Sequence, residues 1–137
     1  MSIQAAAIQR AIALCLEEDV QARGMGARLL YLLSHEGDYG TKADVVAASG
    51  VPALLALLEP KEEVGEEEQE VRELAASAIW GLVCGHPKNK LVVAAQGALT
   101  SMIKLLATCH RHLLSRRGRG VAKSAVLREG QLAALVV

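Results

Sequence analysis

The feature that most constrains this chain is a short phrase that occurs three times and then begins a fourth time. A few small residues followed by a mostly apolar run stand at residues 6–15 (AAIQRAIALC), 49–58 (SGVPALLALL), 97–106 (GALTSMIKLL) and, in shortened form, 130–137 (GQLAALVV). A repeated turn and apolar helix is typical of stacked helical arrays, because one unit cannot bury its apolar face alone. Such an array presents a surface and does not by itself assemble a catalytic site.

The spacing of the phrase sets the size of the unit. Val51 follows Ile8 by 43 residues, and Leu99 follows Val51 by 48 residues. Leu132 follows Leu99 by only 33 residues, so we expect the third unit to be shortened. We therefore predict one domain over residues 1–137, with units at about 1–41, 42–86 and 87–122 and a partial unit at 123–137.

Composition favours an all-α fold. Apolar residues make up 52% of the chain, but only 2% of its residues are aromatic. The core must then consist of Leu, Val, Ile and Ala. Leu and Ala have high helix propensity, and small side chains let helix axes approach closely.

The cysteines and the absence of an export signal indicate the compartment. Cys15, Cys84 and Cys109 are odd in number, and each lies in an apolar helical pattern, which predicts free thiols in a reducing environment. No charged and apolar leader pattern opens the chain, and glycines and charges interrupt every apolar run. We expect an intracellular protein, cytoplasmic or nuclear, without a membrane span.

Helical periodicity places the elements. It predicts helices at about residues 3–16, 20–33, 42–48, 52–58, 70–84, 88–96, 99–109 and 123–129, with a last helix beginning at 132. Residues 35–41 and the charged run 59–69 are predicted connections, and Ser49-Gly50 is a predicted helix stop. The strongest stripe consists of Val71, Leu74, Ala75, Ala78, Ile79 and Leu82. Glycines 24 and 26 cost helix stability but permit close packing.

From residue 45 onward the pattern resembles the armadillo repeat. Residues 49–58 are similar to the second helix of that family's unit, residues 71–82 to its third helix, and residues 89–97 to the first helix of the next unit. The resemblance covers most of residues 5–107. It implies a right-handed α-solenoid of about three armadillo-like repeats with incomplete terminal units.

The sequence departs from the family where peptide-binding members hold their ligand. Those members carry a ladder of third-helix asparagines, often with a tryptophan one turn earlier. Here Gly81 and Leu32 take the asparagine positions, and Ser77 and Arg28 take the tryptophan positions. Importin-type recognition of basic peptides is therefore not implied for this chain.

The resemblance nevertheless implies that stacked third helices line a groove. We expect a protein or peptide partner to bind there, because Trp, Tyr and Arg are enriched at binding hot spots. The candidate partner-binding residues are Trp80, Tyr31, Arg28, Arg72 and Ser77, and Arg23 and Gly81 belong to the same predicted face. The alternative is that Trp80 and Tyr31 only fill gaps between helices.

Other functions are weighed against this one. The chain alternatively forms a structural segment of a larger armadillo scaffold, since the apolar residues 132–137 have no covering helix and also suggest self-association. Nucleic-acid contact through the basic segment 104–128 is disfavoured, because net charge is zero and no aromatic residue is interleaved there. The acidic run 62–70 is expected to be a solvated connection.

No sequence pattern points to an enzyme. No glycine-rich phosphate loop follows a strand, and no serine has a His and acid partner that the sequence places near it. The cluster at residues 109–112 lacks a second Cys/His pair to complete a tetrahedral metal site. We expect no catalytic residue, no metal and no cofactor.

Overall fold

The fold consists of helices packed in two layers. The computed structural model describes residues 2–59, 65–101 and 103–104, and this part of the chain contains no strand. Its elements are α1 (Ile3–Cys15), α2 (Val20–Glu36), α3 (Tyr39–Ala47), α4 (Gly50–Leu57), α5 (Glu66–Val83) and α6 (Pro87–Ala95). Residues 98–101 and 103–104 are also helical. The prediction of an all-α fold is confirmed.

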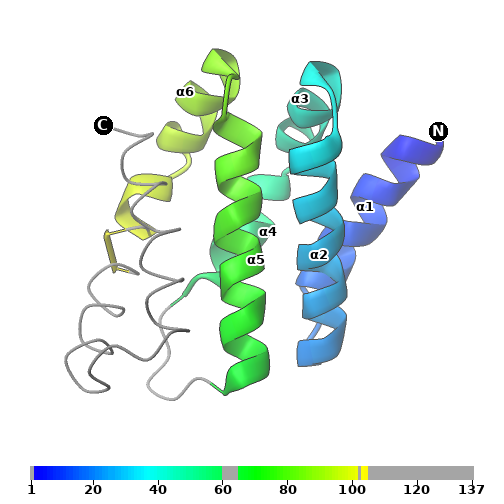
Figure 1. Cartoon of the computed structure of the whole chain (residues 1–137), viewed down its shortest axis with the longest axis vertical. Coiled ribbons are helices and arrows are strands. Elements are labelled where there is room, and N and C mark those ends of the chain that lie inside the picture. Colours follow the sequence, from blue (N-terminus) through cyan, green and yellow to red (C-terminus); the bar gives the residue numbers. More distant parts are fainter. Residues whose placement is uncertain (1, 60–64, 102, 105–137) are drawn as a thin grey trace.

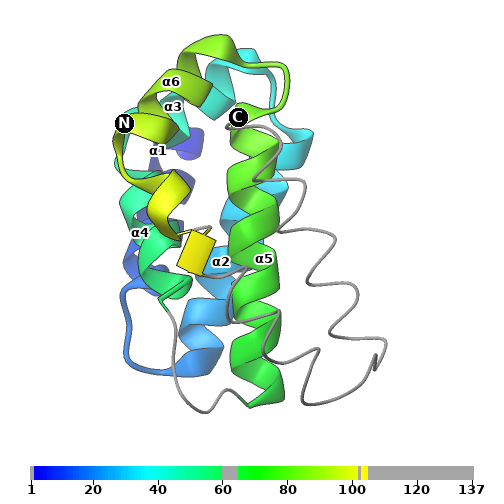
Figure 2. The ribbon, with the colours of Figure 1, turned by 90° about the vertical axis from the view of Figure 1, so that its left-hand side faces the viewer.

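The two longest helices form one layer. In Figure 1, α2 and α5 lie side by side and run in the same direction, with α1 behind α2 and α4 behind α5. A quarter turn shows α1, α3, α4 and α6 on the other side of the α2 and α5 layer (Figure 2). One face of α2 and α5 therefore remains uncovered by the other labelled helices.

Side-chain caps explain where several helices begin. Ser2 accepts from the backbone N–H of Ala5, and Asp38 accepts from that of Thr41 at 2.8 Å. The Thr41 backbone N–H, with a second bond from the Thr41 hydroxyl, holds the pKa of the Asp38 carboxyl below its usual value. Because Asp38 starts α3 at Tyr39, the predicted connection at 35–41 is wrong at both ends: His35 and Glu36 belong to α2.

The acidic connection is also shorter than predicted. Helix α5 begins at Glu66 rather than near residue 70, and Glu66, Glu67 and Glu68 form its first turn. Negative side chains at this position interact favourably with the positive end of the helix dipole. The charge run that indicated a loop therefore contributes to a helix start.

The predicted helix stop at Ser49-Gly50 is the turn between α3 and α4. Ser49, not Gly50, has a left-handed backbone with φ of 70°, and Gly50 begins α4. A Cβ at Gly50 would lie 2.6 Å from the Val45 Cγ1 atom and 2.9 Å from its carbonyl oxygen. Glycine is needed here for close approach rather than for a positive φ.

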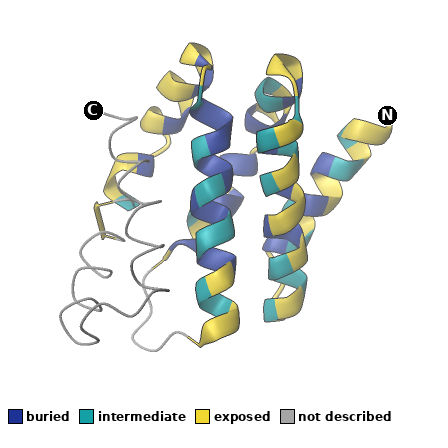
Figure 3. Ribbon diagram, in the orientation of Figure 1, coloured by how far each residue is buried: buried dark blue, intermediate teal, exposed yellow. Residues whose placement is uncertain are grey.

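The core lies between the two layers and is aliphatic, as predicted (Figure 3). Leu30, Leu54, Leu58, Ile79 and Leu82 are its largest fully buried aliphatic side chains. Five of the six residues in the predicted stripe on α5 are buried, and Leu74 is half-buried. Burial of this apolar area is the main stabilising term.

Helices α1 and α2 are in close contact at Gly26. A Cβ at this position would lie 2.6 Å from the Ala11 carbonyl oxygen and 2.6 Å from the Cys15 backbone nitrogen. At Gly24 the nearest atom would be Val71 Cγ2 at an ordinary 3.5 Å. The predicted role of the glycines in close packing is thus confirmed at Gly26.

Cysteines 15 and 84 are free thiols, and Cys109 lies outside the described residues. Burial raises the pKa of the Cys15 thiol to about 11.

Within the described ranges no single helix is both long and apolar enough to cross a membrane. Helices α3 and α4 together have the length and apolar composition of a membrane span, but the pair is bent by 75°.

Candidate functional site

The side of α2 and α5 that faces away from the other labelled helices (Figure 2) brings together side chains that lie far apart in the sequence. We define the α2–α5 face as Arg28, Tyr31 and His35 on α2 and Glu70, Ser77 and Trp80 on α5. Residues three or four apart share one side of a helix, so each helix contributes a single row. The two rows meet because α2 and α5 run side by side (Figure 1).

His35 is the centre of the face. Its ring centroid lies 4.5 Å from that of Tyr31 and 5.7 Å from that of Trp80, with an interplanar angle of 23° to the indole. Its Nε2 lies 2.9 Å from the Ser77 carbonyl oxygen and 3.3 Å from the Ser77 hydroxyl. A carbonyl oxygen can only accept, so Nε2 carries a proton in this arrangement. One imidazole therefore links the aromatic residues of both helices.

Gly81 makes room for this imidazole. A Cβ at Gly81 would lie 3.0 Å from both Cδ2 and Nε2 of His35 and 3.1 Å from the Ser34 Cβ atom. These separations are shorter than ordinary carbon contacts. The position where the resemblance leads one to expect an asparagine thus holds a glycine that accommodates the ring of a neighbouring helix.

The other end of the face is charged and open to solvent. Arg28 Nη2 lies 3.4 Å from Glu70 Oε1, and the two side chains are 63% and 64% exposed. An ion pair this exposed contributes little to stability. Both groups are thus available to a partner at small energetic cost.

Arg72 does not belong to the face, which corrects the sequence prediction. The residue is only 6% exposed, and its Nη2 donates to the Leu58 carbonyl oxygen at 3.4 Å. This contact directs the Arg72 side chain toward the end of α4. A partner on the α2–α5 face would not touch it.

Three of the other predicted residues come together around His35, which was not among the candidates. Tyr31, Ser77 and Trp80 all contact His35, a residue that sequence reasoning assigned to a loop. Tyr31 and Trp80 are half-buried, so each ring both packs between helices and presents an edge to solvent. The signal for His35 was its spacing, four residues after Tyr31 on the same helical side.

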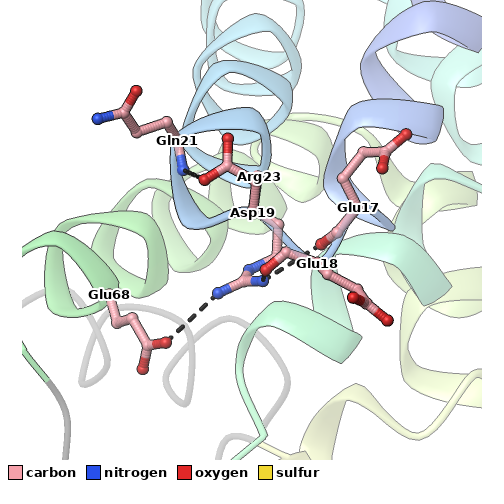
Figure 4. Close-up of polar contacts among 6 residues, drawn as sticks. All are labelled: Glu17, Glu18, Asp19, Gln21, Arg23 and Glu68. Atoms are coloured by element: carbon pink, nitrogen blue, oxygen red, sulfur yellow. Dashed lines mark hydrogen bonds and ion pairs between the residues drawn. The ribbon is translucent and has the colours of Figure 1, made fainter.

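A second cluster lies at the opposite end of α2 (Figure 4). Arg23 Nη1 donates to the carbonyl oxygens of Glu17 at 3.2 Å and Glu18 at 2.5 Å, and Nη2 lies 3.3 Å from Glu68 Oε1. The guanidinium thus binds the turn after α1 and the first turn of α5 at once. A pocket of about 230 Å³ opens beside this cluster, where α1, α2, α4 and α5 meet.

Several other predictions concern residues that the structure does not describe. The Cys/His cluster at 109–112 lies there, as does the basic segment 104–128 apart from Lys104. Among the described residues, no group of three His, Cys, Asp or Glu side chains is arranged to hold a metal ion.

Comparison of this chain with known proteins found no match among protein-family models, curated proteins or solved structures.

Proposed function

We propose that this chain is a non-catalytic interaction module that binds a protein or peptide partner on the α2–α5 face. The observation that carries the proposal is the row of half-buried rings formed by Tyr31, His35 and Trp80 across two helices. Aromatic side chains with one edge in solvent bury a large area on binding and lose little conformational entropy. The exposed Arg28 and Glu70 beside them supply polar contacts at the edge of the surface.

We further propose that the helices form armadillo-like units of a right-handed solenoid. In this interpretation α1 and α2 close the first unit, α3, α4 and α5 make the second, and α6 begins the third. The parallel course of α2 and α5, with α1 and α4 both behind them, supports this interpretation (Figures 1 and 2). A groove along α2 and α5 would then continue over the next unit.

Peptides selected from a random display library on the immobilised wild-type chain test the proposed face. Their affinities are measured for wild type and for the variants Trp80→Ala and Tyr31→Ala. We expect each variant to weaken binding by about tenfold or more, because truncation of an aromatic hot spot costs about 2 kcal/mol. Leu91→Ala, an exposed change on α6, is the control. Selected peptides that bind all variants equally would contradict the proposal.

A second function has its own supporting observation. Met25, Leu29 and Leu32 are exposed at intervals that place them on one side of α2. An apolar stripe of this kind supports a role as a structural segment that packs against further helices of a scaffold. Sedimentation and thermal unfolding distinguish the two: a monomer that melts sharply would contradict the scaffold interpretation.

A further inference from the structure

The pocket beside Arg23 has two kinds of lining. Its apolar wall is formed by Cys15, Leu16, Ala56, Leu57 and Val71. Its charged residues are Arg23, Arg72, Glu17, Glu59 and Glu68. A volume of about 230 Å³ exceeds that of an engineered cavity of about 150 Å³ that binds benzene, so the pocket has room for a small organic group.

Arg72 is a buried charge without a charged partner in the described part of the chain. No carboxylate there forms an ion pair with it, and its single hydrogen bond, to the Leu58 carbonyl oxygen, is long at 3.4 Å. Among the described residues its buried Nε has no hydrogen-bond partner. Arginine does not lose its proton in proteins, and a buried charge is costly unless it is paired. The negative end of the α4 dipole offsets only part of this cost.

The pocket is lined by two arginines and three glutamates, and of these five charged residues only Arg72 is buried. Arg23 and Glu68 form an ion pair at 3.3 Å and neutralise each other. Glu17 and Glu59 are exposed, so solvent and salt screen them strongly. A buried charge is screened much less, and the pocket therefore favours one negative charge next to Arg72. A dianion would add a second negative charge close to the glutamates.

We propose that this pocket binds a monocarboxylate with a short aliphatic body. The carboxylate pairs with the guanidinium of Arg72 in a charge-assisted contact, which is stronger than a hydrogen bond between neutral groups. The aliphatic body packs against Leu57 and Val71. The same chemistry occurs in a free small carboxylic acid and in the C-terminal residue of a peptide. This proposal does not depend on the α2–α5 face. The pocket is lined by residues of α1, α2, α4 and α5, and none of them belongs to that face.

Isothermal titration of the full chain with isovalerate tests this site, and isovaleramide is the uncharged control of nearly the same shape. We expect saturable binding of isovalerate and no measurable binding of the amide. The variant Arg72→Met keeps a long apolar side chain and removes the charge, and it should weaken isovalerate binding by about tenfold or more. Arg10→Met removes an exposed arginine on α1 that does not line the pocket and should leave the affinity unchanged.

A tripeptide that ends in leucine, with a free or an amidated C-terminus, distinguishes the two sources of the carboxylate. Binding of the free-acid tripeptide but not of its amide supports a peptide C-terminus, and binding of isovalerate alone supports a small acid. Equal affinity for acid and amide on the wild-type chain would overturn the proposal, even if Arg72→Met failed to fold. Failure of both isovalerate and the free-acid tripeptide to bind would also overturn it.

Discussion

Replacement of Gly26 by alanine tests how closely α1 and α2 pack. The added methyl would lie 2.6 Å from the Ala11 carbonyl oxygen, 2.6 Å from the Cys15 backbone nitrogen and 2.8 Å from the Cys15 sulfur. Two of these neighbours are backbone atoms of α1, so a side-chain rotation cannot relieve the overlap. Helix α1 must instead move away by several tenths of an ångström, which loosens the apolar contacts along the whole helix pair.

Two opposing terms set the magnitude. Alanine in a helix interior is favoured over glycine by about 1 kcal/mol. Overpacking a close helix contact costs about 3 kcal/mol where backbone must shift. We therefore expect Gly26→Ala to lower the free energy of unfolding by about 2 kcal/mol.

Gly24→Ala is the matched control, on the same helix and two residues away. Its methyl would meet only Val71 Cγ2 at 3.5 Å, so the propensity term stands alone and should raise the free energy of unfolding by about 1 kcal/mol. Urea unfolding followed by circular dichroism measures both variants, and an unchanged denaturant slope shows that the unfolded state is unaffected. Equal midpoints for the two variants would refute the close approach of α1 and α2.

Three further predictions concern other contacts. Asn89→Ala removes the Nδ2 hydrogen bonds to the carbonyl oxygens of Leu82 at 2.9 Å and Lys42 at 3.1 Å. It should lower the free energy of unfolding in urea by about 2–4 kcal/mol, whereas Lys90→Ala, at an exposed position, should change it little. Because the pKa of the Cys15 thiol is raised, only the thiol of the unfolded chain ionises between pH 9.0 and about 11. The free energy of unfolding should therefore fall across this window by about 1.4 kcal/mol per pH unit, and Cys15→Ala should abolish this contribution. Gly81→Ala should displace the imidazole beside the indole and shift tryptophan fluorescence; an unchanged spectrum would contradict the crowding seen at Gly81.

The sequence predicts the elements of this fold well because its helices carry local signals. Apolar spacing locates α1 to within one residue at its C-terminus, and the helix predicted at 88–96 lies within one residue of α6 at both ends. The errors arise where one residue type serves two purposes. The glutamates at the start of α5 resemble a solvated connection, although they also stabilise a helix N-terminus. Local composition does not separate these two roles.

The site was less predictable than the fold, because its contacts join different helices. Nothing near residue 35 in the sequence shows that its ring reaches Ser77, since that contact spans 42 residues. Arg72 shows the same limit: its type indicated a surface, and only the position of α4 shows that it is buried. Periodicity states which side of a helix a residue occupies, but not which helix that side meets.

The pairing of Gly81 with His35 connects the packing of the molecule to its proposed binding surface. A glycine on α5 and a large ring on α2 occupy a space that two ordinary side chains would overfill. The same imidazole positions the Trp80 indole and the Tyr31 phenol through ring contacts. A side chain larger than glycine at position 81 would therefore change the α2–α5 face without itself touching a partner. Under the proposed function, a partner meets the edges of aromatic rings at this face, whereas an asparagine ladder would offer it amides. Peptides selected on the face should therefore share the shape of their side chains rather than a repeated contact to their backbone.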